Sequence, residues 1–502
     1  MANILIIGGG VSGLSAGIYA RLNGHRATVC ERLPVAGGNL TGWQRKGYRI
    51  DNCIHWLTGT NPATPTYRMW VELGALGDVE VYQGETLYTC EYNGQSLSLC
   101  RDAEELGRAM LALSPEDERE IRAFLNAVRL VRGFCGIGGE TYDRGIRRGE
   151  LGSALPTLLR DYRMTTGELA SRFRHPLLRQ FITAFLGEDF AALALITVAA
   201  QFCGNNGGIP VGGSMAMRDR MVARLRELGG ELLPNREATR IEVRDGRAVA
   251  VDFADGSSAE PDYVILTTDP AVTFGTLLPC KMPRGLRRQY RNPAMVRFSS
   301  CQCAFSCDRE ALPFRGELAL PVPTGLRGVL KGKTVILREF SHEPDFAPAG
   351  KVVLQSLIFC DEAEARRLID LHRDDEYAAE KRNLAEATAA LILERFPELA
   401  PGLSCLDVWT PATYRRYVAS EIGSYMGFAL LPGMLPLRLS NRVRGLKNVV
   451  LATQWLRAPG GLPIAAEEGK RAVGTILQLE RSFRRRRLHA PDPLPNANNL
   501  SH

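Results

Sequence analysis

A glycine-rich turn between an apolar strand and a helix constrains the fold more than any other feature of this sequence. The apolar run Asn3–Ile7 predicts a β-strand, and the residues from about Ser12 to Leu22 predict a helix. Between them stands Gly8-Gly9-Gly10-Val11-Ser12-Gly13, which fits the pattern G-x-G-x-x-G. Its glycines permit a tight turn, close approach of backbone to a pyrophosphate, and close packing of helix on strand. The turn predicts a dinucleotide site, with Gly8, Gly10, Val11, Ser12 and Gly13 as candidate cofactor-binding residues.

A carboxylate follows at the distance that such a site requires. The strand predicted at Ala27–Glu31 ends on Glu31, about 20 residues beyond the turn, where an acidic side chain accepts a hydrogen bond from a ribose hydroxyl. Arg32 comes next in the chain and is a further candidate for binding the cofactor. The glycine pattern and the carboxylate together favour a dinucleotide fold, but they leave a nicotinamide and a flavin cofactor both open.

The segment after Glu31 resembles the flavin amine oxidase and phytoene desaturase superfamily. Gly37-Gly38-Asn39 and then Gly47-Tyr48-Arg49-Ile50-Asp51 follow the order found in that group. The resemblance implies FAD as the cofactor, with Gly38 and Asn39 beside it. Members usually carry arginine where this chain has Asn39, so the chain departs from the family pattern at the diphosphate.

A second match lies near the C-terminus. The strand Asn448–Ala452, Gln454 and then Pro459-Gly460-Gly461-Leu462-Pro463 at a helix start resemble the C-terminal flavin motif of phytoene desaturases and retinol saturases. The resemblance implies that Gln454, Gly461, Leu462, Pro463 and Ile464 contact the flavin, where a helix N-terminus would stabilise its negative charge. In the middle of the chain, the backbone amide of Ala238 would contact the adenine end.

These matches divide the chain into two predicted domains, because 502 residues exceed what one hydrophobic core supports. We expect an α/β fold: a Rossmann-type FAD-binding domain of the glutathione-reductase kind, with an inserted mixed α+β substrate domain. The FAD-binding domain would take residues 1–60, 205–275 and 441–480. The substrate domain would take 61–204 and 276–440, and 481–502 would form a basic, disordered tail.

Four local patterns make further structural predictions. Asp245-Gly246 between alternating runs predicts a β-hairpin, and residues 179–202 predict one buried helix. The strand predicted at Ser299–Cys307 places Cys301, Cys303, Phe305 and Cys307 on one face, as expected for a core more than for a metal site. Residues 133–149 are rich in glycine and arginine and predict a loop, and residues 463–479 predict the final helix.

The catalytic residues are less constrained, because a flavin carries out most of its own chemistry. His55 lies in a segment that the resemblance places near the flavin, and histidine titrates near neutral pH. His55 is therefore the candidate acid or base, with a purely structural histidine as the alternative. Cys53 is a candidate for covalent flavin attachment or, as a small buried residue, for packing alone.

The resemblance implies an oxidoreductase that desaturates, saturates or isomerises C–C and C=C bonds of an apolar polyene, isoprenoid or lipid. The alternatives are a flavin amine oxidase and a non-catalytic lipid or prenyl escort of the GDP-dissociation-inhibitor type. A second G-x-G-x-x-G after a strand is absent, so the electron donor or acceptor is not identified.

Composition limits the partners and the location. The net charge of +7 comes without an aromatic-interleaved basic stripe, so we expect no nucleic-acid partner. The 12 cysteines form no C-x-x-C pair, and no apolar run reaches the ~18 residues of a membrane span. We expect a cytoplasmic protein. The run Arg484–Arg487 suits either peripheral contact with an anionic membrane or a solvated helix end.

Overall fold

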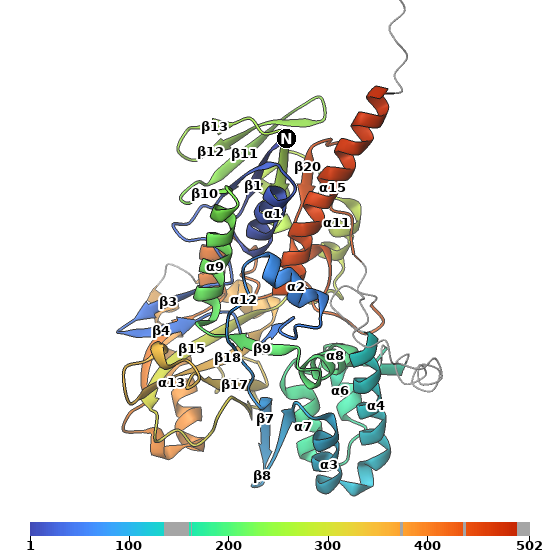
Figure 1. Ribbon diagram of the computed structural model, residues 1–502. Helices are drawn as coiled ribbons and strands as arrows, with labels where there is room; N and C mark the ends of the chain where they lie inside the picture. The colour runs from blue at the N-terminus through green and yellow to red at the C-terminus, as the bar shows by residue number, and fades with distance from the viewer. Residues whose placement is uncertain (135–159, 162, 372–374, 435–437, 489–502) are drawn as a thin grey trace, which may run out of the picture.

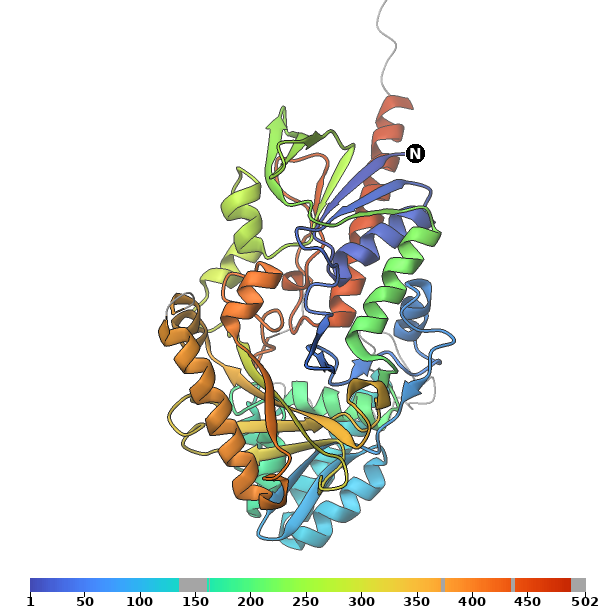
Figure 2. The ribbon, with the colours of Figure 1, turned by 90° about the vertical axis from the view of Figure 1, so that its left-hand side faces the viewer.

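The computed structural model describes residues 1–134, 160–161, 163–371, 375–434 and 438–488. A parallel sheet with its helices forms the upper part of the molecule in Figure 1, and a mixed sheet and a cluster of helices form the lower part. The view turned by 90° separates the same two parts (Figure 2). The α/β class predicted from the sequence is confirmed.

The upper sheet has five parallel strands in the order β10-β2-β1-β14-β20. Their bounds are Glu231–Leu233, Arg26–Cys30, Asn3–Ile7, Tyr263–Leu266 and Val449–Leu451, in the same order. The strands therefore come from three stretches of chain that lie far apart in sequence. The order of the strands reverses at β1, because β2 and β10 lie on one side of it and the later strands β14 and β20 lie on the other. Ligands bind at such a switch point, beyond the carboxyl ends of the strands.

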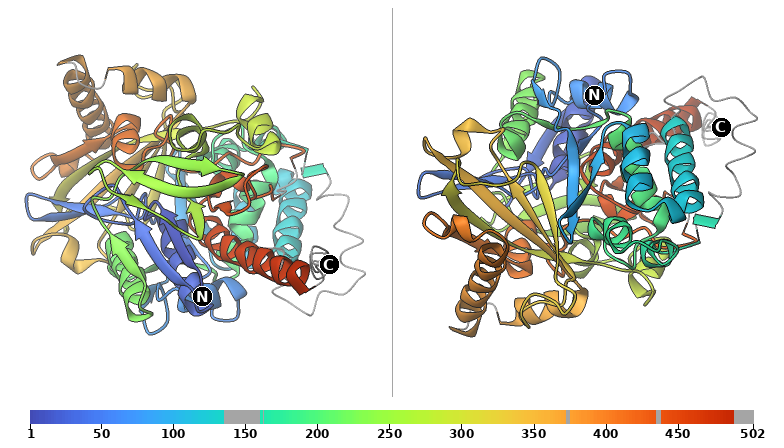
Figure 3. Two further views of the ribbon diagram at one scale, coloured as in Figure 1. Left: turned by 90° about the horizontal axis from the view of Figure 1, so that it is seen from above. Right: turned by 90° about the horizontal axis from the view of Figure 1, so that it is seen from below.

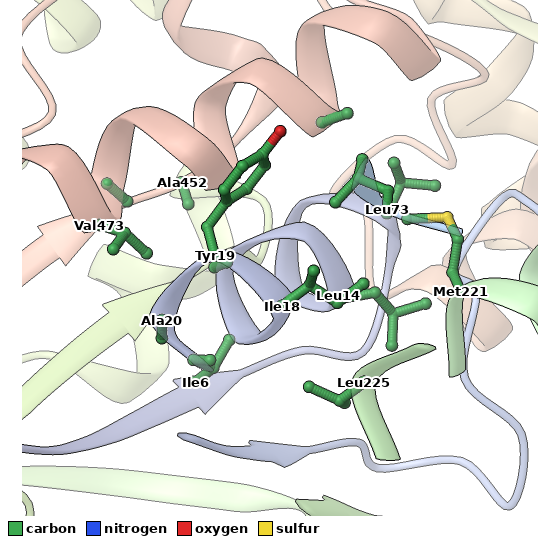
Figure 4. Close-up of a cluster of buried hydrophobic side chains, with 14 of the residues drawn as sticks. Ile6, Leu14, Ile18, Tyr19, Ala20, Leu73, Met221, Leu225, Ala452 and Val473 are labelled. Atoms are coloured by element: carbon green, nitrogen blue, oxygen red, sulfur yellow. The ribbon is translucent and has the colours of Figure 1, made fainter. Parts of the chain in front are cut away.

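Both faces of this sheet are covered, as its continuous apolar strands require. Ile4 and Ile6 point into a core shared with α1 (Val11–Leu22), α9 (Gly213–Glu227) and α15 (Leu462–Leu488). Figure 4 shows α1 lying between β1 and α15 in this core. Leu5 and Ile7 point the other way, into a second core.

The second core is covered by an antiparallel sheet of β11 (Ala238–Arg244), β12 (Arg247–Phe253) and β13 (Ser258–Ala259). Asp245 and Gly246 join β11 to β12 with φ angles of +50° and +72°. Positive φ at both central residues suits a hairpin turn. The hairpin predicted at this dipeptide is confirmed.

The lower sheet has seven strands in the order β19-β15-β18-β17-β16-β7-β8. Their bounds are Ser404–Trp409, Ser299–Asp308, Lys351–Cys360, Thr334–Glu339, Glu317–Pro321, Thr86–Tyr92 and Gln95–Cys100. Cys301, Cys303, Phe305 and Cys307 of β15 are all buried in one apolar core, as predicted. Among the residues that the structure describes, no group of side chains is suited to hold a metal ion.

Helices lie at both ends of the lower sheet: α13 (Asp375–Arg395) contacts β15 and β19, and α3 (Ala103–Leu113) contacts β8. Figure 3 shows α13 and α15 on opposite sides of the molecule when it is viewed from above. The bounds of the helices are α2 Pro65–Glu72, α3 Ala103–Leu113, α4 Glu118–Phe134, α6 Thr166–Ala170, α7 Pro176–Ala184, α8 Ala192–Cys203, α10 Pro270–Val272, α11 Arg284–Arg291, α12 Glu362–Asp370, α13 Asp375–Arg395 and α14 Pro411–Val418.

Short elements complete the described chain. The strands are β3 Gly42–Arg45, β4 Tyr48–Asp51, β5 Leu57–Thr58, β6 Val81–Tyr82 and β9 Gly207–Pro210. The helical turns are η1 Pro115–Asp117, η2 Thr273–Leu277, η3 Pro344–Phe346, η4 Pro397–Leu399 and η5 Gln454–Leu456. The loop predicted at 133–149 falls largely outside the described residues.

Two predictions about helices are wrong. The single helix expected at 179–202 is two helices, α7 and α8, and Gly187 between them has a φ of +93°, which a continuing helix does not permit. The final helix continues through Leu488 instead of ending at Leu479, so the segment 481–488 belongs to α15. Arginine is a good helix former, and Gly or Pro does not recur before Pro491. The rest of the expected tail, residues 489–502, lies outside the described residues.

Candidate functional site

A cavity of about 530 Å³ opens beyond the carboxyl ends of β1, β14 and β20. Gly10, Thr267 and Thr453, which follow these three strands, all line it. This is the switch point of the parallel sheet, where the fold favours ligand binding. Most of the predicted site residues meet here: Gly10, Val11, Ser12, Gly38, Asn39, His55, Gln454, Gly461, Leu462, Pro463 and Ile464.

The glycine turn has the close contacts that its pattern predicts. Gly8 has a φ of +103°, and a Cβ atom on Gly13 would lie 1.9 Å from the Gly8 carbonyl oxygen. Gly10 is the N-cap of α1 and brings no side chain to cap it. The first turn of α1 therefore presents backbone N–H groups and the positive end of the helix dipole to the cavity.

Glu31 lies behind the glycine turn, outside the lining of the cavity. Its Oε2 atom accepts from the Gly9 N–H at 2.7 Å, and its Oε1 atom accepts from the Leu33 N–H at 2.9 Å. Burial raises the pKa of the Glu31 carboxyl, and the backbone donors oppose this effect only in part. The carboxylate thus holds the shape of the turn. Its contact with a ribose stays a prediction.

Four other predicted residues also lie outside the cavity lining. Gly8 and Gly13 act through the packing of the turn. The Arg32 guanidinium donates to the Arg416 carbonyl oxygen, and Ala238 begins β11. A cofactor role for Arg32 and Ala238 stays a prediction.

The C-terminal motif is held against the N-terminal helix. The Ser12 hydroxyl donates to the Ala465 carbonyl at 2.8 Å, and the Ser15 hydroxyl donates to the Ala466 carbonyl at 2.7 Å. The Gly461 N–H donates to Gln454 Oε1 at 2.8 Å. These bonds bring the N-termini of α1 and α15 to the same cavity, although more than 450 residues separate Ser12 from Ala465 in sequence.

Asn39 has a different role from the arginine that the family pattern carries. Its Nδ2 atom donates to the Tyr425 carbonyl at 3.1 Å, and its own carbonyl accepts from Asn52 at 3.0 Å. Asn39 Oδ1 is buried and has no hydrogen-bond partner among the described residues. Asn39 thus fixes two loops beside the cavity and leaves one polar atom for a ligand.

An aromatic wall runs from His55 away from the glycine turn. It is defined by Tyr425, Phe359, Phe298 and Phe190, all of which line the cavity. Successive ring centroids, starting from His55, lie 6.5, 6.0, 5.1 and 5.4 Å apart. These spacings are typical of interacting aromatic pairs. Neighbouring rings meet edge to face, and together they make this end of the cavity apolar.

One face of α8 lines the same apolar end. Leu193, Ala194, Thr197 and Val198 reach the cavity, while Leu195 and its neighbours on the opposite face pack into the core of the helical cluster. The lower sheet contributes Ile336 of β17 and Leu357 of β18 to the lining of the cavity. The sequence predicted a buried helix here but gave no sign that half of it faces a cavity, because both faces are apolar.

His55 pairs with a carboxylate that the sequence analysis did not identify. His55 Nδ1 lies 2.9 Å from Glu317 Oε1, and Glu317 begins β16 of the lower sheet. Arg338 of β17 lies 3.7 Å from the same oxygen. The sequence signal for this pair was an acidic residue at the start of the apolar strand Glu317–Pro321. Its partner, His55, could not be identified from sequence because it lies 262 residues away.

Cys53 also lines the cavity, close to His55 in sequence. Burial raises the pKa of the Cys53 thiol far above its usual range, and the nearby Asp51 carboxylate adds to this effect. The thiol therefore stays protonated near neutral pH, and a protonated thiol is a poor nucleophile. This environment favours packing over covalent attachment of a flavin.

Residues 11–477 match the family described as flavin containing amine oxidoreductase. The chain belongs to this family. The family implies an FAD cofactor, and the chain is an FAD-dependent oxidoreductase of the phytoene desaturase-like kind. The resemblance stated from the sequence is confirmed.

Two curated relatives cover most of this flavoenzyme. A lycopene-forming phytoene desaturase from Paracoccus sp. is 23% identical over 94% of this chain and 97% of the relative. A chloroplastic prolycopene isomerase 2 from an Oncidium hybrid cultivar is 24% identical over 91% of this chain and 79% of the relative. Their names describe a desaturation and an isomerisation.

A solved structure of an oxidoreductase from Methanosarcina mazei has the same fold. It superposes with a TM-score of 0.61 at 16% identity and covers 95% of this flavoenzyme and 99% of its own chain. At this identity the likeness concerns the fold alone. Across the described residues, no helix is long and apolar enough to cross a membrane.

The cavity suits the cofactor that the family implies. A Cβ atom on Gly10 would extend toward the backbone of Gly37 and Gly38. Because these three residues are glycines, the space between them stays open beside the N-terminus of α1. Buried Asn39 Oδ1 and Ser424 Oγ, on two of the loops that line the cavity, have no hydrogen-bond partner in the described parts of the chain. Open backbone and unpartnered polar atoms are what a bound dinucleotide would fill and satisfy.

Proposed function

We propose that this flavoenzyme desaturates, saturates or isomerises C–C and C=C bonds of a long apolar polyene, isoprenoid or lipid. One observation carries the proposal. The glycine turn and the C-terminal motif form one end of a cavity whose other end is the aromatic wall and the apolar face of α8. A long apolar chain would lie along such a wall. The names of the two curated relatives support the same class of substrate.

In this proposal the upper sheet holds FAD. The N–H groups at Val11, Ser12 and Gly13 would bind its diphosphate, and Glu31 would bind a ribose hydroxyl once FAD enters. The N-terminus of α15, at Gly461–Ile464, would lie at the flavin ring and stabilise negative charge there. Gly38, Asn39 and Gln454 would line the path between these ends, with Arg32 and Ala238 toward the adenine. When bound, FAD supplies acceptance or donation of a hydride.

The substrate end excludes water and orients the chain. Phe298, Phe359 and Leu193 all line the cavity and would give the substrate apolar contact. Tyr425 joins the two ends, because its carbonyl is held by Asn39 while its ring contacts the ring of Phe359. Tyr425 would therefore set how far the substrate reaches toward the glycine turn. Such a substrate is membrane-soluble, so we also propose peripheral contact with a membrane.

The first test is the absorption spectrum of the purified protein, before and after addition of FAD. The protein is then mixed with liposomes that carry phytoene or prolycopene, under air or with a quinone, and the polyenes are separated by chromatography. Flavin bands together with a changed polyene spectrum would support the proposal.

Each alternative predicts a different result. A flavin amine oxidase would leave the polyenes unchanged and release hydrogen peroxide when it is given a panel of primary amines. A lipid escort would extract polyene from the liposomes without showing flavin bands, even after FAD is added. Either result would overturn the proposed function.

A further inference from the structure

A group of three polar residues begins at His55, which lines the cavity between the aromatic wall and the cofactor end. It consists of His55 on the loop after β4, Glu317 at the start of β16 and Arg338 on β17. The side chains of Glu317 and Arg338 are only 6% and 5% exposed, and that of His55 is 16% exposed. Burying the charges of Glu317 and Arg338 costs free energy, which their pairing at 3.7 Å offsets only in part. The group therefore needs an explanation beyond packing.

We propose that Glu317 is a positioning residue that makes His55 the proton-transferring group of the active site. The Glu317 carboxylate accepts a hydrogen bond from His55 Nδ1–H, across the 2.9 Å that separates Nδ1 from Oε1. The hydrogen bond at one ring nitrogen fixes the tautomer, so Nε2 carries the free lone pair. His55 lines the cavity, and Nε2 has no hydrogen-bond partner among the described residues.

Arg338 supports this arrangement from the neighbouring strand β17, where it lies directly across from Glu317. Its guanidinium lies 3.7 Å from Glu317 Oε1 and stacks on Phe340 at 4.4 Å from the ring centroid. It offsets part of the cost of burying the Glu317 carboxylate. The second oxygen, Glu317 Oε2, is buried and has no hydrogen-bond partner in the described parts of the chain. Glu317 thus holds His55 through one oxygen only, which makes that single bond decisive for the orientation of the ring.

The place of His55 in the cavity suits proton transfer to and from a polyene carbon. Its ring meets Tyr425 edge to face, with centroids 6.5 Å apart. The loop that carries Tyr425 packs on the C-terminal motif: a Cβ atom on Gly460 would lie 2.8 Å from the Gly427 nitrogen. His55 is therefore beside the end of the aromatic wall that lies nearest to the predicted flavin ring. A substrate lying along the wall would present a carbon to Nε2.

This inference rests on the proposed function for its substrate. In a desaturation, one C–H bond would lose its proton to His55 Nε2 while the neighbouring carbon loses a hydride to FAD, and a C=C bond forms between them. In a saturation, protonated His55 would give the proton from Nε2–H while reduced FAD gives the hydride, and the C=C bond becomes a C–C bond. In an isomerisation, the same nitrogen would give and take back one proton, with no net change in electrons.

The experiment uses full-length protein labelled with ¹⁵N-histidine, loaded with FAD. The His55 signals are assigned by their loss in His55→Asn. We expect Nδ1 of His55 to be protonated and Nε2 to be unprotonated in the wild type near pH 8, and this preference to be lost in Glu317→Gln. A wild-type His55 that is protonated on Nε2 alone would overturn the proposal without any activity measurement.

Activity gives the second readout. Glu317→Gln should lower kcat at least tenfold and His55→Asn about 100-fold, with KM and flavin content little changed. Glu339→Gln is the matched control, because Glu339 is a buried carboxylate on β17 that bonds the backbone of Gly316 and Ser341 instead of His55. The Glu339→Gln variant should keep kcat within about threefold of wild type, because it loses only hydrogen-bond strength at a site away from the reacting atoms.

The outcomes separate the two proposals. Equal losses in Glu317→Gln and Glu339→Gln, or a parallel loss of flavin in His55→Asn, would show a structural role and overturn the positioning proposal. A wild type that has the expected tautomer but turns over no polyene would overturn the proposed substrate instead. A wild type that acts on polyenes, with an unaffected Glu317→Gln, would keep the function and overturn the inference.

Discussion

At the scale of single residues, two buried carboxylates have functions that their hydrogen bonds define. Glu31 and Glu343 each accept bonds from backbone N–H groups at a glycine turn that precedes a helix. A carboxylate in this position both fixes the turn and faces the positive end of the helix. Replacing Glu31 or Glu343 should therefore change cofactor retention or stability, whereas replacing an exposed carboxylate should not.

Replacement of Glu31 by alanine should weaken retention of FAD. The change removes the acceptor of the Gly9 and Leu33 N–H groups as well as the expected ribose acceptor, so a loss of about 1–3 kcal/mol in binding free energy is expected. The ratio of flavin to protein absorbance after dialysis measures this loss. Glu231→Ala, at an exposed carboxylate on the neighbouring strand β10, is the control. Equal flavin content in the two variants would contradict the assignment of Glu31.

Glu343 should make stability depend on pH. Its carboxylate accepts from the Gly212 N–H at 2.9 and 3.1 Å, and burial raises its pKa to about 7, from 4.5 for the free group. Because the folded state holds the proton more tightly, the stabilisation is complete below pH 4.5 and is lost as pH rises through about 7.

Glu343→Gln cannot ionise, so its free energy of unfolding should rise relative to that of the wild type between pH 4.5 and 7. The relative gain should be at most about 3 kcal/mol. Urea unfolding at a series of pH values measures it. Glu310→Gln, at an exposed carboxylate, should follow the wild-type curve. A pH-independent difference between Glu343→Gln and wild type would refute this assignment.

At the scale of elements, the contact of α1 with α15 brings the two cofactor motifs together. A Cβ atom on Gly469 would lie 2.5 Å from the Ser12 carbonyl oxygen and 2.7 Å from Ser15 Cβ. The two helices can therefore approach closely only because α15 has glycine at this position. The hydroxyls of Ser12 and Ser15 then reach the first turns of α15.

Gly469→Ala should separate the two helices. We expect a loss of about 1–3 kcal/mol in unfolding free energy, together with weaker FAD retention, because overpacking forces the backbones apart. Gly474 lies one and a half turns further along α15, and a Cβ atom there would meet nothing within 4 Å. Gly474→Ala should instead raise stability by up to about 1 kcal/mol. Thermal unfolding measures both, and changes of the same sign would disprove the close-packing argument.

At the scale of the whole molecule, the cavity joins parts that belong to different cores. The upper sheet supplies the strand ends, the lower sheet supplies Phe359 with Phe298 just before β15, and the helical cluster supplies α8. The separation into an FAD-binding domain and a substrate domain stays a prediction, but FAD at the strand ends and a substrate at the apolar end would together contact all three parts. Substitutions far from the cofactor end should therefore change how the substrate is used and not how FAD binds.

Ala194→Phe tests this expectation. The new ring would occupy the apolar end of the cavity, beside Leu193 and Val198, and should lower turnover of a long polyene about tenfold or more by displacing it. Flavin content should not change. Val71→Phe adds the same ring at a position that is 40% exposed on α2, and it should leave turnover unaffected. Chromatography of the polyene products measures both, and a parallel fall in flavin content would argue against the assignment of this end to substrate.

The sequence by itself determined the local parts of this protein. The Gly8–Gly13 turn, the carboxylate at Glu31 and the glycine pair before α15 follow from neighbouring residues, because backbone sterics and helix termini act over a few positions. The family resemblance then extended these motifs to a fold and a cofactor. Helix ends did not follow from the apolar pattern. The break at Gly187 and the extension of α15 to Leu488 depend on glycine and arginine residues that lie outside this pattern.

Tertiary structure decided what surrounds the cofactor end. Glu317 reaches His55 across 262 residues, and the aromatic wall takes its four rings from four separate regions of the chain. A buried acid in a strand and scattered phenylalanines look the same in sequence whether they face a core or a cavity. Only the packing of the two sheets against α8 fixes which apolar faces remain open, because each face can be satisfied by any neighbour of suitable shape.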